Sequence, residues 1–176
     1  MAYLPFNDDD FLTLNEALDI AEDATGNFYK FSLGQWKRHR YDVKTLASLR
    51  ANEIAQQAFA LLNKGARAIS GFESNTKSRD FYFICLQDHQ IQKALERDKA
   101  LGLLPLLIYV FTHELIHIVR FCNFFQRFDV SGKEKDKEET IVHETTFEVL
   151  GNIALPKLDY VLDSYQGHRI CDMVVS

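Results

Sequence analysis

The chain has 176 residues, of which 47% are apolar and 26% charged, and its formal net charge is -5. These values are typical of a soluble globular protein, and they exclude disordered and fibrous classes. We expect residues 1–176 to form a single domain around one core. Because no basic patch accompanies the slightly acidic balance, neither a nucleic-acid partner nor an anionic membrane surface is expected.

The cysteines and the apolar runs bear on the compartment. Cys85, Cys122 and Cys171 show no CxxC spacing, which predicts reduced thiols, and the first residues lack the basic-then-apolar order of a signal peptide. The longest strongly apolar run, residues 101–111, is about eleven residues long, well short of the roughly 20 that cross a bilayer. We therefore expect a cytoplasmic protein without a membrane segment.

The first predicted elements lie between residues 12 and 65. Apolar residues at helical spacing predict a helix over about 12–24, and an alternating pattern over 29–33 predicts a strand that ends at Gly34. A second helix is predicted from Asp42, a candidate N-cap, to just before Gly65. The apolar stripe along this second helix consists of Leu46, Leu49, Ile54, Ala58, Leu61 and Leu62.

The middle of the chain is predicted to supply the rest of a small sheet. Residues 66–73 are a candidate short strand, and residues 81–86 are rich in β-formers on both faces, which predicts a well-covered strand. Asp88 can cap a polar helix that continues to about Lys99.

The C-terminal half is predicted to be helical. Residues 104–126 are apolar nearly all round, which favours a central buried helix, and further helices are expected at about 137–153 and 157–165. The order of elements predicts an α+β domain in which two or three strands pack on the central helix.

The central helix contains the sequence His113-Glu114-Leu115-Ile116-His117. Residues four apart lie on one face of a helix, so both imidazoles can bind one metal ion, and Glu114 lies beside them. Two hydrogen-bonded core histidines are the alternative, but they leave the charged Glu114 in an apolar helix unexplained. This pattern therefore predicts a zinc ion that lowers the pKa of a bound water, with Glu114 as the general base.

Over roughly residues 80–155 the chain resembles the zincin metallopeptidases. The resemblance implies a zinc-dependent hydrolase that acts on a peptide or protein, with His113 and His117 as zinc ligands and Glu114 as the catalytic base. The extended metzincin motif is absent, since Arg120 and Asn123 stand where it has glycine and histidine. The gluzincin type, which takes its third ligand from a glutamate on the next helix, fits better.

Three residues of that next helix are candidates for the third ligand. A helical wheel puts Glu139 and His143 on one edge of the buried face and turns Glu144 away from it. Glu139 is favoured, with His143 orienting a ligand from behind. The roles of Glu139 and His143 could be exchanged, and a small error in helix phase would admit Glu144.

Two further features of the site are expected. Tyr160, Tyr165 and His168 are candidates to stabilise the developing oxyanion. The resemblance also implies that an extended substrate pairs with a strand beside the active helix, for which residues 81–86 are the best candidate.

Two other functions compete with the hydrolase. A zincin-like domain could keep the metal for stability alone and bind a partner. A di-iron carboxylate protein would use the ExxH pattern of Glu114 and His117, but it needs a second ExxH, and Thr140 stands where that glutamate would precede His143.

Overall fold

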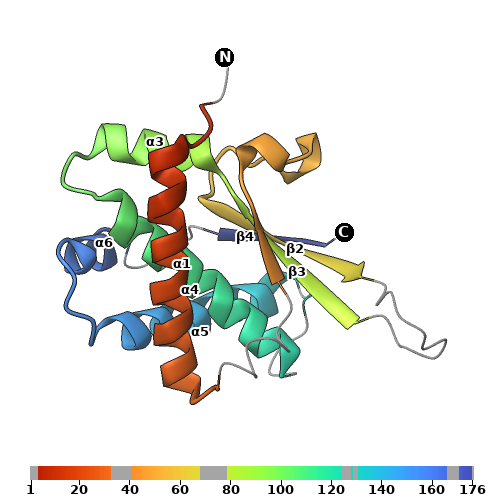
Figure 1. Ribbon diagram of the computed structural model, residues 1–176. Helices are drawn as coiled ribbons and strands as arrows, with labels where there is room; N and C mark the ends of the chain where they lie inside the picture. The colour runs from red at the N-terminus through yellow and green to blue at the C-terminus, as the bar shows by residue number, and fades with distance from the viewer. Residues whose placement is uncertain are drawn as a thin grey trace.

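Five α-helices and four strands lie within the residues that this computed structural model describes, 4–32, 41–67, 79–123, 128, 131–165 and 171–175. The strands form one sheet in the order β1-β3-β2-β4, and the long helices lie to one side of it (Figure 1). The predicted α+β class is confirmed, and the sheet is larger than the two or three strands expected.

The sheet is mixed. The interior strand β3 (Arg79–Leu86) pairs parallel with β1 (Tyr41–Lys44) and antiparallel with β2 (Ala60–Arg67), and β4 (Cys171–Val175) joins β2 in parallel. Ile84 of β3 belongs to the main core, and a smaller apolar cluster covers the opposite face. Its buried members are Ala58, Leu61 and Cys85. The prediction of a well-covered strand over residues 81–86 is therefore confirmed.

The helix predicted from Asp42 to Gly65 is wrong. This segment forms β1, two short 3-10 turns (Leu46–Ser48 and Ala51–Glu53) and β2. Its apolar residues are spaced for a helix, but Leu62 pairs in register with Ile84 and is fully buried in the sheet. Burial against strand partners distant in sequence outweighed the local helical period.

Helix α1 (Asp8–Tyr29) is longer than predicted at both ends. Asn7 caps it and forms a reciprocal capping box with Asp10. At its end Lys30 adopts a left-handed conformation, and the Phe31 N–H donates to the Gly26 carbonyl at 2.7 Å. The strand expected over 29–33 is therefore wrong where the chain is described, and Leu33 lies outside the described residues.

The other helices lie close to their predicted ranges: α3 (Asp88–Arg97), α4 (Leu103–Cys122), α5 (Gly132–Leu150) and α6 (Leu158–Ser164). Strand β4 was not predicted. Residues 66 and 67 of the candidate strand over 66–73 belong to β2, and residues 68–73 lie outside the described residues.

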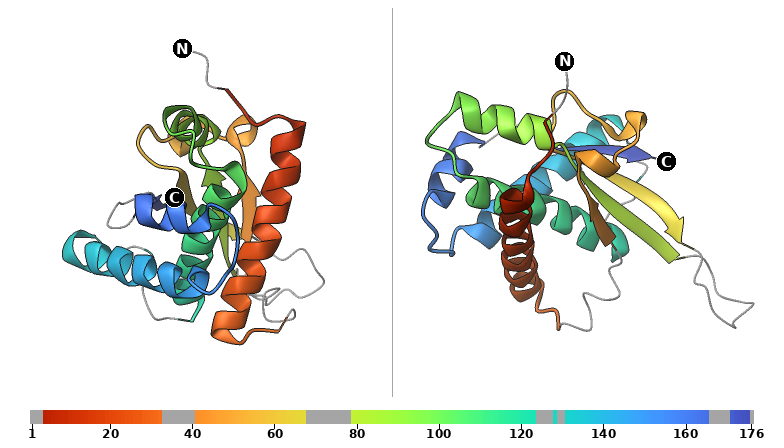
Figure 2. Two further views of the ribbon diagram at one scale, coloured as in Figure 1. Left: turned by 90° about the vertical axis from the view of Figure 1, so that its left-hand side faces the viewer. Right: turned by 45° about the horizontal axis from the view of Figure 1, so that its top comes forward.

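Helix α4 is the centre of the domain. It contacts α1, α5, α6 and strands β2 and β3, and Figure 2 shows α1 and α5 on either side of it. Its length and composition would suit a membrane span, but 83% of its most apolar window is buried inside the fold. That burial is typical of the core helix of a globular domain.

Candidate metal centre

His113 and His117 lie one turn apart on the buried side of α4, as their spacing predicts. Their ring centroids are 5.0 Å apart, and the two residues are 1% and 0% exposed. Glu114 is also fully buried next to them. Polar side chains at this depth require compensation by a partner or an ion.

Helix α5 brings Glu139 to the two imidazoles. Its Oε2 lies 3.3 Å from His113 Nε2, and its Oε1 lies 3.3 Å from His117 Nε2. The three ligand atoms of this group all lie within 4.8 Å of one another. In a tetrahedral zinc site with bonds of about 2.0–2.1 Å, neighbouring ligand atoms are about 3.3–3.4 Å apart. These distances are compatible with such an ion; each imidazole faces a different oxygen of Glu139, and the His113 contact is also a hydrogen bond.

The hydrogen bonding of His117 supports the same fit. Within the described part of the chain its Nε2 makes no hydrogen bond, although the residue is fully buried. Glu139 Oε1 is 3.3 Å from this nitrogen, which in its unprotonated form can donate its lone pair to an ion held together with Glu139.

Proton binding in the group follows from burial and from the neighbouring charges. Burial lowers the pKa of His113 below its ordinary value. Burial acts on His117 in the same direction, but the carboxylates around it, Glu139 first, outweigh burial and raise its pKa. Burial acts to raise the pKa of Glu139, but the two imidazoles hold it far below its ordinary value. Glu139 is therefore a carboxylate at neutral pH, and a metal that binds His117 competes with a proton for the ring nitrogen.

A second carboxylate, Glu138, lies behind His117. Its Oε1 is 3.8 Å from His117 Nδ1, and Arg120 donates to both of its oxygens, at 2.7 Å from Nε and 2.9 Å from Nη2. The pair holds a fully buried carboxylate next to the imidazole. We did not predict this pair, although Arg120 stands one turn after His117 and so lies on the same side of the helix.

His143 and Glu144 lie outside the three-residue group. His143 is one turn after Glu139 on α5, and its Nδ1 is 3.1 Å from the hydroxyl of Tyr109. Glu144 is exposed, as the helical wheel predicts. The structure thus brings Glu139, the favoured third candidate, to His113 and His117, and it places His143 beside a tyrosine of α4.

The other expected site features fare differently. The Tyr160 hydroxyl donates to Asp98 Oδ2 at 2.6 Å, a contact that does not favour its expected role at the oxyanion. Tyr165 stacks on Tyr109 at 6.1 Å, and His168 lies outside the described residues. Strand β3, expected to pair with substrate, is interior and has both edges occupied by β1 and β2. Among the described strands, only β1 and β4 are edges.

No family model, no curated protein and no solved structure matches this chain.

Proposed function

We propose that this protein is a zinc-dependent hydrolase that cleaves peptide bonds. The observation that carries the proposal is the convergence of His113, His117 and Glu139, with Glu114 fully buried on the same helix and its charge acting on His117. The resemblance of the HExxH helix to the gluzincins supports the same reaction class.

Zinc is the ion that this donor set fits best. Two imidazoles and one carboxylate form the usual protein ligand set of a catalytic zinc site, which leaves one position open. All-oxygen sites suit magnesium or calcium instead, and a pair of irons requires further inward carboxylates and a second ExxH motif. A bound zinc would act as a Lewis acid and lower the pKa of a water molecule towards 7.

The residues of the chain have separate roles in this proposal. His113, His117 and Glu139 hold the ion, and the carboxylate of Glu114 accepts a proton from the attacking water and returns it to the leaving amine. Glu138 and Arg120 position the His117 ring from behind. These six side chains come from α4 and α5, whose packing sets their geometry.

A second candidate function is a domain that binds the ion only for stability. The depth of the centre favours it: both histidines and Glu114 are almost fully buried, and the Glu139 side chain is only 11% exposed. A catalytic centre requires that water and substrate reach the ion, whereas a structural one does not.

One pair of measurements separates the two functions. Elemental analysis of the purified protein gives the ion and its stoichiometry, and a peptide library, with and without a chelator, gives the activity. We expect one zinc per chain and chelator-sensitive cleavage. Glu114→Gln should retain zinc but lose cleavage, whereas His117→Ala should lose both. Bound zinc without cleavage would favour the structural function, and wild-type protein without zinc would contradict both functions.

A further inference from the structure

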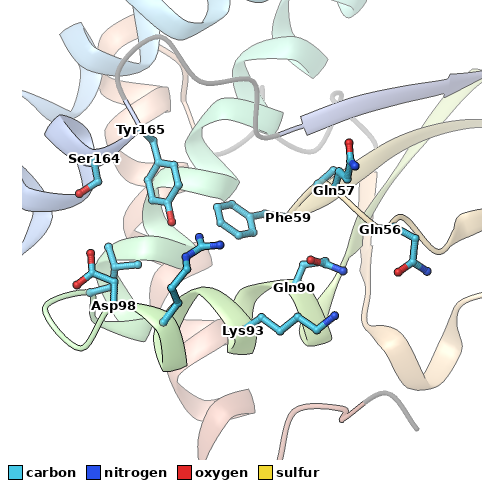
Figure 3. Close-up of a pocket in the computed structure, with 11 residues that line it drawn as sticks. Gln56, Gln57, Phe59, Gln90, Lys93, Asp98, Ser164 and Tyr165 are labelled. Atoms are coloured by element: carbon cyan, nitrogen blue, oxygen red, sulfur yellow. The ribbon is translucent and has the colours of Figure 1, made fainter. Parts of the chain in front are cut away.

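A pocket of about 520 Å³ lies at the surface where α3, the end of α6 and the chain entering β2 meet. Figure 3 shows Phe59 and Tyr165 beside each other on one side of it, with Lys93 and Gln90 along α3. Its volume is within the range of small-ligand sites, about 300–1,000 Å³. None of the metal-centre residues lines it.

The α3 side of the pocket is basic. Gln90, Lys93 and Arg97 line it from successive turns of one helix face. Both cations are exposed, so their charged groups are available to a ligand from solvent. This side of the pocket can therefore donate several hydrogen bonds to an anion.

The remaining polar groups offset that charge only in part: the charges of Asp98 and Arg97 interact, and Arg97 also hydrogen-bonds the Tyr165 hydroxyl. Among the described residues that line the pocket, Asp98 is the one acid, and it already accepts from the Tyr160 hydroxyl at 2.6 Å and the Ala100 N–H at 3.0 Å. Gln56 and Gln57 add amide groups on the opposite side (Figure 3). A ligand with a carboxylate and nearby peptide groups matches these donors and acceptors.

An aromatic wall connects the pocket with the metal centre. Phe59 and Tyr165 contact edge to face at 5.3 Å, and Tyr165 stacks on Tyr109 of α4 at 6.1 Å. Tyr109 in turn lies 6.5 Å from the His113 ring. From Tyr165 to His113 the distance is thus at most about 13 Å, but the Tyr109 ring between them is fully buried, so a peptide that reaches both must pass around it and needs at least about four extended residues.

We propose that this pocket binds a carboxylate of the peptide substrate, either an acidic side chain or a free C-terminus, at least about four residues from the bond that is cleaved. The position relative to the cleaved bond rests on the proposed function, whereas the binding itself does not. Lys93 and Arg97 pair with the carboxylate, and Phe59 and Tyr165 contact the neighbouring peptide.

Calorimetric titration of Glu114→Gln protein, in which cleavage is not expected, tests the binding. The probes are N-acetylated hexapeptides of alanine and phenylalanine that end in a free carboxylate, in an amide, or in an amidated aspartate or asparagine. We expect a carboxylate to tighten binding about tenfold or more over its neutral counterpart. The comparison of the free acid with the amide, and of aspartate with asparagine, shows which source of carboxylate is preferred.

Paired variants locate the effect. Lys93→Gln/Arg97→Gln should abolish the preference for a carboxylate. The control Lys133→Gln/Lys137→Gln removes two exposed cations at the same spacing from α5 and should keep it. Equal binding of acidic and neutral peptides by wild-type chain, or a preference that survives in the Lys93/Arg97 variant, would overturn the proposal. Zinc binding and cleavage of neutral peptides are measured separately, so a failed hydrolase and a failed carboxylate pocket give different results.

Discussion

The carboxylate of Glu138 is 0% exposed, and the guanidinium of Arg120 donates to both of its oxygens. Replacing one partner of a buried ion pair leaves the other charge without compensation, which costs about 3–5 kcal/mol. We therefore expect Arg120→Met to lower the free energy of unfolding by about 3–5 kcal/mol in urea denaturation. The double variant Arg120→Met/Glu138→Met should recover much of the loss, since no buried charge remains. A loss below about 1 kcal/mol in the single variant would argue against this role.

Cys85 is a residue whose environment predicts its reactivity. It is fully buried between strands, and burial raises the pKa of its thiol to about 12. Because the thiolate is the reactive form, Cys85 should not react with a disulfide reagent at pH 8 while the protein is folded. The measurement uses Cys122→Ser/Cys171→Ser protein, which retains only this thiol. One thiol should appear on addition of guanidinium, and rapid labelling of the folded protein would contradict the burial.

At the scale of elements, Asp88 joins three segments of the chain at the start of α3. Its Oδ2 accepts from the Phe6 N–H at 2.8 Å, and its Oδ1 accepts from the Leu46 N–H at 3.0 Å. Asp88→Ala leaves both donors without this acceptor, and a buried donor without a partner costs about 1–3 kcal/mol. Burial raises the pKa of Asp88, which means that the wild type bears a cost for burying this carboxylate. Asp88→Ala removes that cost, so the net loss of stability is smaller than the cost of the unpaired donors alone.

We therefore expect Asp88→Ala to lower the free energy of unfolding by about 2 kcal/mol in a denaturant titration. Asp88→Asn keeps one acceptor oxygen and should lose less. If the alanine and asparagine variants were equally stable, the two hydrogen bonds would not be what joins these segments.

The elements also differ in how well their sequences predict them. Helix α4 was predicted because its apolar residues cover the whole circumference over five turns. An apolar run of that length is longer than a buried strand. The prediction for residues 42–62 was wrong because the apolar spacing of this segment suits a helix as well as it suits the strands that form there. Leu49 belongs to that apolar stripe, and Ala55 follows its member Ile54. Both cover the outer face of the sheet together with Leu61. The segment forms a strand and not a helix because β3 is available to pair with it, and β3 lies about twenty residues further along the chain.

At the scale of the whole molecule, the candidate metal ligands His113, His117 and Glu139 join α4 to α5, so an ion bound there should contribute to the stability of the fold. An ion that binds only the folded state stabilises it by about 4 kcal/mol when its free concentration is a thousand times its Kd. For a chain of this length, 1 kcal/mol shifts Tm by about 2–4 °C.

We accordingly expect zinc to raise Tm by about 8–16 °C over chelator-treated protein in a thermal melt. Calcium should have no such effect, because the group contains two imidazoles. His117→Ala protein should melt at the same temperature with and without zinc. A zinc-dependent shift that persists in this variant would place the ion elsewhere.

What the sequence by itself determined is the local geometry of the metal centre. The four-residue spacing of His113 and His117 puts both rings on one face of any α-helix, and the helical wheel favours Glu139 while leaving His143 and Glu144 as alternatives. These predictions needed only the regular geometry of one helix at a time. The structure brings the three residues together as expected.

What only the tertiary structure decided involves partners distant in sequence. The pairing of β4 with β2, the ion pair of Arg120 with Glu138, and the stack of Tyr165 on Tyr109 all join separate elements. The basic pocket likewise needs α3, the entry to β2 and the end of α6 at once. No periodic pattern encodes such contacts, because they depend on how elements pack and not on the repeat within any one of them.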